Sequence, residues 1–166
     1  MTSQPRTWVP SIEQLEASPG FPSQAELKER PLAVIECIEE IPCNPCESAC
    51  PFGAIEVGQP ITNLPRLVVD RCRGCGLCLP ACPGQAIFLV DMTYSEREAA
   101  VSFVHEFLPL PRKGAIVNAV DRAGQVVCQA TVLQVLNPAK YDRSPVIKLA
   151  VPKELAHQVR GMQRLG

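Results

Sequence analysis

Apolar side chains recur at helical spacing in residues 95–108, where Ser95 and Glu98 also have the spacing of a capping box. This pattern predicts a helix. Two prolines follow directly and cannot continue a helix, so the chain enters a linker there. We therefore assign residues 92–113 to a helix and a linker.

Toward the C-terminus the pattern changes to the alternation typical of β-strands. Two apolar segments, 115–120 and 125–136, flank a short polar turn and predict a β-hairpin. A third strand is predicted at 146–151, and the spacing in residues 153–165 predicts a terminal helix. Residues 114–166 are thus expected to form a small β unit with a terminal helix.

The N-terminal residues 1–31 have too few apolar positions to form a core. Ser11 and Ser23 each stand at the N-cap position of a short helical segment. Two interpretations stay open, a disordered tail or an extended N-terminal arm that lies across a partner subunit. Trp8 and Phe21 favour the arm, because large apolar side chains are unfavourable in a solvated tail.

Composition and charge narrow the class of protein. The 166 residues include 16 basic and 17 acidic side chains, which excludes a strongly basic nucleic-acid binder. No apolar run is long enough for a membrane span, and no secretory signal is recognisable, so a cytoplasmic protein is expected. Nine cysteines in such a chain indicate metal binding rather than disulfides, and eight of them lie between positions 37 and 82.

Four of these cysteines form one motif in residues 72–83, spaced C-x2-C-x2-C-x3-C and followed by proline. Three closely spaced thiolates can hold three corners of one iron–sulfur cubane, and the fourth can reach a second cluster. Gly74 and Gly76 allow the tight backbone that brings N–H groups near the sulfurs.

The motif has a second copy earlier in the chain. A shift of 32 residues superimposes the last three cysteines of each copy, and a shift of 35 superimposes Cys37 and the preceding strand on Cys72 and its strand. Each copy then consists of strand, ligand loop, short helix and strand. On this alignment the first copy carries three extra residues between its first two ligands.

The repeat predicts two sets of four ligands. The first cluster would be held by Cys37, Cys43, Cys46 and Cys82, and the second by Cys72, Cys75, Cys78 and Cys50. Two alternatives stay open. One is a pair of four-cysteine zinc sites, and the other is a three-iron first cluster that leaves Cys37 free.

Residues 32–91 resemble a bacterial two-cluster ferredoxin on these motifs. The resemblance implies two [4Fe-4S] clusters in an α+β module with a pseudo-two-fold repeat. Each cluster exchanges one electron, and four thiolate ligands leave no open position for a substrate. We expect electron transfer and no catalytic site on this chain.

Residues 34–46 and 115–155 resemble the small iron–sulfur subunits of multi-subunit FAD-dependent amino-acid dehydrogenases, which oxidise proline, hydroxyproline, opines or sarcosine. This resemblance implies a flavoprotein partner in a hetero-oligomer, with FAD on the partner and not on this chain. Electrons from oxidation of an amine C–N bond would pass singly through the two clusters to an external acceptor. The alternative is a free, diffusible ferredoxin.

Both histidines and the ninth cysteine lie outside the cysteine module. His105 borders the apolar face of the expected helix and is interpreted as a packed or solvated side chain. Cys128 is expected to be a buried free thiol, and His157 is expected at the surface.

Overall fold

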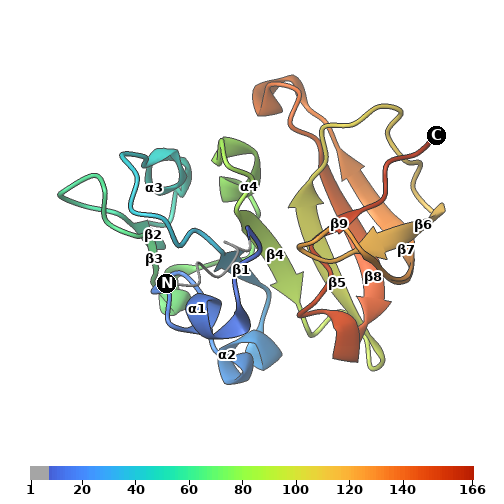
Figure 1. Cartoon of the computed structure of the whole chain (residues 1–166), viewed down its shortest axis with the longest axis horizontal. Helices are drawn as coiled ribbons and strands as arrows, with labels where there is room; N and C mark the ends of the chain where they lie inside the picture. Colours follow the sequence, from blue (N-terminus) through green and yellow to red (C-terminus); the bar gives the residue numbers. More distant parts are fainter. Residues whose placement is uncertain (1–7) are drawn as a thin grey trace, which may run out of the picture.

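The computed structural model describes residues 8–166, so the first seven residues of the expected arm lie outside it (Figure 1). A seven-stranded sheet runs through the molecule with all neighbouring strands antiparallel. Its strands, in spatial order, are β1 (Leu32–Ile35), β4 (Ile87–Asp91), β5 (Glu98–Val104), β8 (Val146–Pro152), β7 (Val126–Leu136), β6 (Ile116–Val120) and β9 (Gly161–Met162).

The remaining elements are short. A second sheet pairs β2 (Ile55–Glu56) with β3 (Arg66–Leu67). The α-helices are α1 (Ile12–Glu16), α2 (Gln24–Glu29), α3 (Pro45–Ala49) and α4 (Cys78–Ala81). The 3-10 turns are η1 (Val69–Arg71), η2 (Ala139–Tyr141) and η3 (Lys153–Leu155).

The N-terminal segment packs against its own chain. Ser11 and Ser23 cap α1 and α2 with complete capping boxes, which confirms both predicted N-caps. Leu15 is fully buried, and Leu27 is part of the hydrophobic core. A disordered tail is therefore wrong for residues 8–31, because this segment packs against the cysteine module of its own chain.

The helix predicted within residues 95–108 is wrong, because β5 occupies this segment and pairs with both β4 and β8. Ser95 does accept a hydrogen bond from the Glu98 N–H (3.0 Å), but the contact belongs to a turn before the strand. Residues 99–103 are buried on both faces of the sheet. A strand covered on both sides has no polar face, so its apolar pattern is easily confused with a helix.

The predicted hairpin and third strand are confirmed as β6, β7 and β8, but the terminal helix is wrong. Residues 153–165 form the turn η3 and the short strand β9. The N–H groups of Arg160 and Gln163 donate to Val120 O and Asn118 O (2.9 and 2.8 Å). Pairing with β6 thus takes the hydrogen bonds that a helix would have used.

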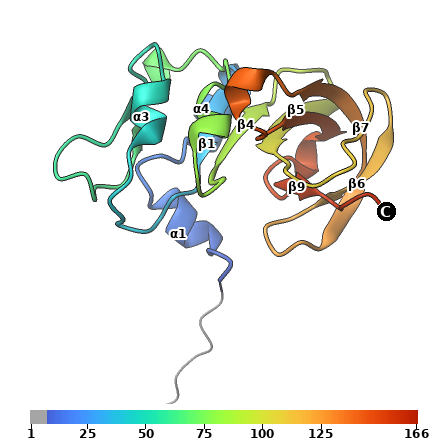
Figure 2. The same ribbon diagram turned by 90° about the horizontal axis from the view of Figure 1, so that it is seen from above.

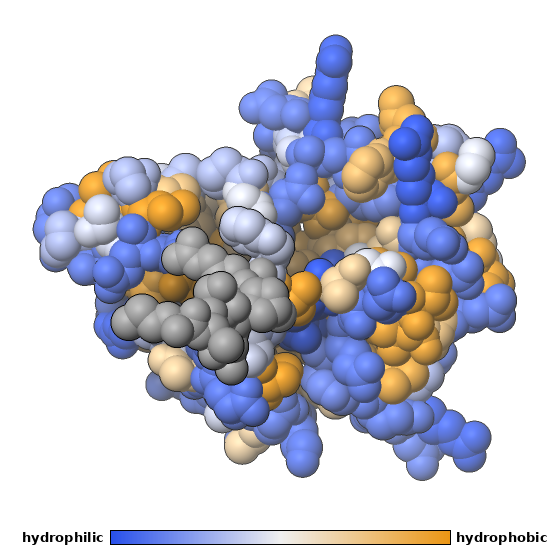
Figure 3. Space-filling view, in the orientation of Figure 1, coloured by the Kyte–Doolittle hydropathy of each residue, from blue (hydrophilic) through white to orange (hydrophobic). Residues whose placement is uncertain are grey.

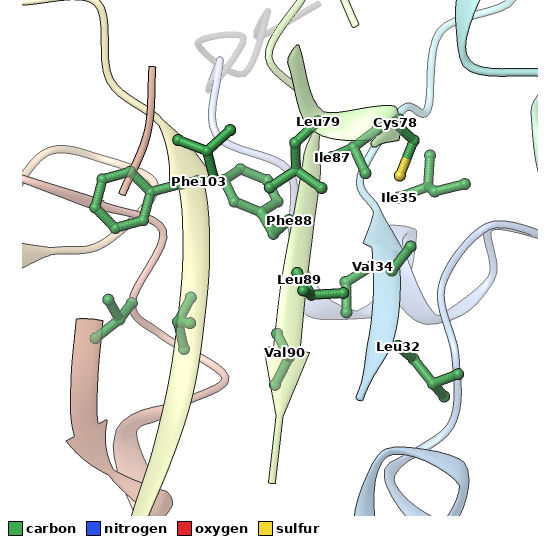
Figure 4. Close-up of a cluster of buried hydrophobic side chains, with 14 of the residues drawn as sticks. Leu32, Val34, Ile35, Cys78, Leu79, Ile87, Phe88, Leu89, Val90 and Phe103 are labelled. Carbon is green, nitrogen blue, oxygen red and sulfur yellow. The ribbon is translucent and has the colours of Figure 1, made fainter. Parts of the chain in front are cut away.

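The cysteine module and the C-terminal strands share one sheet, because β4 pairs with β1 on one side and with β5 on the other. Side chains of β1, β4 and β5 form a continuous core, with Leu79 and Cys78 of α4 beside it (Figure 4). From above, β5–β9 curl around one another at one end of the molecule, and α1 and α3 lie toward the other (Figure 2). The expected boundaries at residues 91 and 114 therefore do not separate independent cores.

None of the helices between residues 8 and 166 has both the length and the apolar character needed to cross a membrane.

Candidate metal centre

One cavity is lined by the four cysteines predicted to hold the second cluster. Three of them come from the loop before α4 and from α4 itself, and the fourth, Cys50, follows α3 in the other half of the module. Apolar side chains, including Ile55 and Leu89, form the rest of the wall. The cavity thus combines thiol donors with an apolar lining. Its four cysteines are Cys50, Cys72, Cys75 and Cys78.

A second cavity is lined by the four cysteines predicted for the first cluster. Here the residue from the other half of the module is Cys82, which follows α4, while the other three belong to the first half. Because Cys50 and Cys82 each line the cavity of the opposite half, we call them the exchanged cysteines. Cys37, assigned by the shifted alignment, lies in this set. Its four cysteines are Cys37, Cys43, Cys46 and Cys82.

The two exchanged cysteines have the same local geometry. The Ala54 N–H donates to Cys50 Sγ (3.3 Å), and the Ala86 N–H donates to Cys82 Sγ (3.4 Å). The residue before each of these alanines has a positive φ, 61° at Gly53 and 50° at the non-glycine position 85. This left-handed turn folds the chain back so that its N–H groups reach the sulfur.

The strands of the two halves repeat at an interval of 32 residues, which corrects the interval of 35 expected for them. Ile35 pairs with Ile87 across β1 and β4, and Leu67 pairs with Ile55 across β3 and β2. The three additional residues before Cys72 form the 3-10 turn η1. The first ligand of each half therefore follows its strand at a different distance, although the strands themselves correspond.

Backbone and burial both act on the thiols. The Ala33 N–H donates to Cys72 Sγ (3.5 Å), a contact that stabilises negative charge on sulfur. Burial raises the pKa of the Cys46 thiol to about 11 and that of Cys78 to about 12, and neighbouring cysteines contribute to both shifts. A metal that binds these sulfurs at neutral pH therefore has to displace protons.

The glycines of the second ligand loop adopt the backbone expected from the sequence. Gly74 and Gly76 have φ values of +64° and +75°. A Cβ at Gly74 would also lie 2.8 Å from Pro31 Cβ, so the loop is held against the segment before β1. A side chain there would be strained and crowded.

A buried ionic cluster next to the first set of cysteines was not predicted from the sequence. Glu36 accepts hydrogen bonds from Arg122 Nε and Arg160 Nε, both at 2.8 Å. Burial alone would raise the pKa of Glu36, but the two guanidinium groups outweigh it and lower that pKa. Arg122 and Arg160 lie 86 and 124 positions after Glu36 in the chain, so no local sequence pattern could have predicted their contact with it.

The other candidate residues lie outside both cavities. His157 is exposed, as expected, whereas Cys128 is only half-buried. His105 is buried, in agreement with the packed interpretation. Within residues 8–166 no three His, Cys, Asp or Glu side chains are placed to hold a single metal ion.

Comparison with known proteins agrees with an iron–sulfur module. A family model, the LdpA Fe-S cluster-binding domain, matches residues 37–93. The chain is 35% identical over 66 residues to the ferredoxin-type protein NapF of Haemophilus influenzae, a match that covers 36% of this chain and 35% of the relative. It is 29% identical over 117 residues to Protein Pixie of Drosophila melanogaster (60% of this chain, 19% of the relative).

A further relative is one component of the Na(+)-translocating ferredoxin:NAD(+) oxidoreductase complex of Acetobacterium woodii, 34% identical over 62 residues (37% of this chain, 17% of the relative). The chain spans about a fifth of the length of Protein Pixie and of the RLI1 translation initiation factors that it also matches. No solved structure matches the chain.

Proposed function

We propose that the chain is an iron–sulfur, ferredoxin-like protein with an electron-transfer role, which the comparisons support, and that its clusters have a specific arrangement. Two [4Fe-4S] clusters are held by the two sets of cysteines, with Cys50 and Cys82 exchanged between the halves. The observation that carries this proposal is that each predicted set lines its own cavity.

The residues around the cavities suit this role. When bound, a [4Fe-4S] cluster accepts and releases one electron at a time. Four thiolate ligands would leave no open position on such a cluster, so the chain would exclude substrate from the metal. N–H groups aimed at Cys50, Cys72 and Cys82 offset negative charge on the sulfurs. The paired strands and exchanged cysteines support a pseudo-two-fold α+β module of the bacterial ferredoxin type.

We further propose that the chain is a subunit of a flavin-dependent complex that oxidises an amino acid or another amine. FAD would be bound by the partner subunit, and electrons would leave through this chain to an external acceptor. Support comes from the resemblance of residues 34–46 and 115–155 to such subunits. The C-terminal strands, which extend the sheet of the module, add a surface that a minimal ferredoxin does not need.

A diffusible carrier is the second candidate, favoured by the match to the ferredoxin-type protein NapF. Mild anaerobic purification of the tagged chain from its host distinguishes the two. A flavin-containing subunit that co-purifies in fixed proportion supports the complex. A lone protein with about eight irons supports the carrier.

The ligand assignment is tested with Cys82→Ser and Cys50→Ser. We expect each variant to lose iron from one cluster, the first for Cys82 and the second for Cys50, as measured by iron analysis and electron paramagnetic resonance of the reduced protein. Cys128→Ser is the matched control, since this thiol lies outside both cavities. Full iron content with unchanged spectra in both test variants would refute the exchanged ligands.

A further inference from the structure

A wide groove opens beside the first set of cysteines, and we call it the arm groove. It reaches three of the four cysteines. One wall comes from the N-terminal segment and another from the loop after β1. Its lining includes Trp8, Cys37, Glu39, Ile41 and Cys82.

The walls of the arm groove carry exposed apolar side chains. Trp8 is 90% exposed and Ile41 is 49% exposed. Both side chains are large and apolar, whereas the face of the molecule seen in Figure 3 is mainly hydrophilic. Tryptophan is also among the side chains most enriched at the centres of protein interfaces. The groove therefore offers two apolar anchors close to a predicted redox centre.

The rim of the arm groove is acidic. Glu39 lines the groove and Glu40 follows it in the chain. Both are exposed, and neither forms an ion pair among residues 8–166. Glu36 also lines the groove, but two arginines already neutralise it. The free charge at this opening is thus negative.

The two halves of the module differ in charge. Residues 32–65 contain five acidic and no basic side chains, whereas residues 66–91 contain three arginines and two aspartates. Two of these arginines, Arg66 and Arg71, are paired with Glu56. A cationic surface is therefore attracted more strongly to the first half of the module than to the second.

We propose that the arm groove is the docking site of a cationic electron-transfer partner. Lysine or arginine side chains of that partner meet Glu39 and Glu40, and an apolar group between them packs on Trp8 and Ile41. This inference rests on the proposed function, because docking here matters only if the cysteines of the groove hold a redox centre. It assigns the segment around Trp8 a role in partner recognition.

Trp8 is the single tryptophan of the chain, so its indole N–H gives one proton resonance that reports on the groove. The test titrates the oxidised, cluster-loaded full chain with hexaamminechromium(III), a redox-inert paramagnetic cation. We expect this cation to broaden the Trp8 resonance at a lower concentration than the anion hexacyanochromate(III). Glu39→Lys with Glu40→Lys should raise the cation concentration needed by about tenfold at low salt.

The matched control is Glu96→Lys with Glu154→Lys, which makes the same charge change at exposed residues outside the groove. Equal effects of the two double variants, or stronger broadening by the anion in the unmodified chain, would overturn the proposal. Iron analysis of the same samples distinguishes failure of the proposed function from failure of the docking site. A chain that loads no iron refutes the proposed function, whereas a loaded chain without cation preference refutes only the docking site.

Discussion

His105 is buried beside the Phe107 ring, and its Nε2 atom has no hydrogen-bond partner among the described residues. Burial lowers the pKa of this imidazole below its ordinary value. The folded chain therefore keeps His105 neutral at a pH where the unfolded chain binds a proton. Its sequence position, next to an apolar segment, predicted packing but could not predict the missing partner.

The lowered pKa predicts a pH-dependent stability. The contribution of neutral His105 is complete above the unfolded pKa of about 6.5 and is lost as the pH falls toward the folded pKa. We expect His105→Gln to remove a slope of up to about 1.4 kcal/mol per pH unit from the free energy of unfolding in this range. Urea unfolding of the loaded chain between pH 7.5 and 5.5 measures it. The exposed His157→Gln is the control, and an equal slope in both variants would contradict the prediction.

Gly20 lies where the N-terminal segment touches the module. Its carbonyl accepts a hydrogen bond from the Ile35 N–H (3.0 Å), and an added Cβ would lie 2.7 Å from Ile35 Cβ. We expect Gly20→Ala to lower the free energy of unfolding by about 1–3 kcal/mol, because the neighbouring backbone must shift. At Gly84 an added Cβ meets nothing within 4 Å, so Gly84→Ala serves as the control in the same urea titration. Equal free energies of unfolding for Gly20→Ala and Gly84→Ala would show that Gly20 does not lie close to Ile35.

At the scale of elements, ion pairs connect the end of β1 to the C-terminal strands. Glu36, Arg122 and Arg160 form these pairs, and we call them the Glu36 cluster. Arg122 belongs to the turn between β6 and β7, and Arg160 precedes β9. Arg160 also donates to Ala156 O and Val159 O (2.9 and 2.7 Å), and it lies over the Phe88 ring at 5.2 Å. One carboxylate thus fixes two distant loops next to the first set of cysteines.

Removal of the Glu36 charge should lower the free energy of unfolding. Glu36→Gln leaves two buried guanidinium groups without their anion, so we expect a loss of about 3–5 kcal/mol in the free energy of unfolding. The control is Glu56→Gln, which removes an exposed partner of Arg66 and Arg71 and should cost less than about 1 kcal/mol. Chemical denaturation of both loaded variants measures the difference. A loss at Glu36 no larger than that at Glu56 would show that the cluster does not hold the loops.

At the scale of the whole molecule, a single sheet joins the cysteine module to the C-terminal strands. Leu89 and Val90 of β4 pair with Ser102 and Val101 of β5. A chain that ends at residue 94 would leave this edge and its apolar side chains exposed.

We therefore expect the chain truncated after residue 94 to aggregate or to lose iron, whereas the full chain remains loaded. Size-exclusion chromatography with iron analysis of both proteins tests this. A truncated monomer that keeps about eight irons would show that the module folds without β5.

The sequence by itself determined which cysteines lie together and where two short helices begin. Cysteine spacing predicted both sets of four residues, and serine positions predicted both capped helices, because loops and caps depend on residues close together in the chain. Only the tertiary structure decided that residues 98–104 form a strand and that residues 153–165 do not form a helix. Burial on both faces and pairing with distant strands override local spacing. The Glu36 cluster and the arm groove likewise depend on residues far apart in sequence, which only the fold brings together.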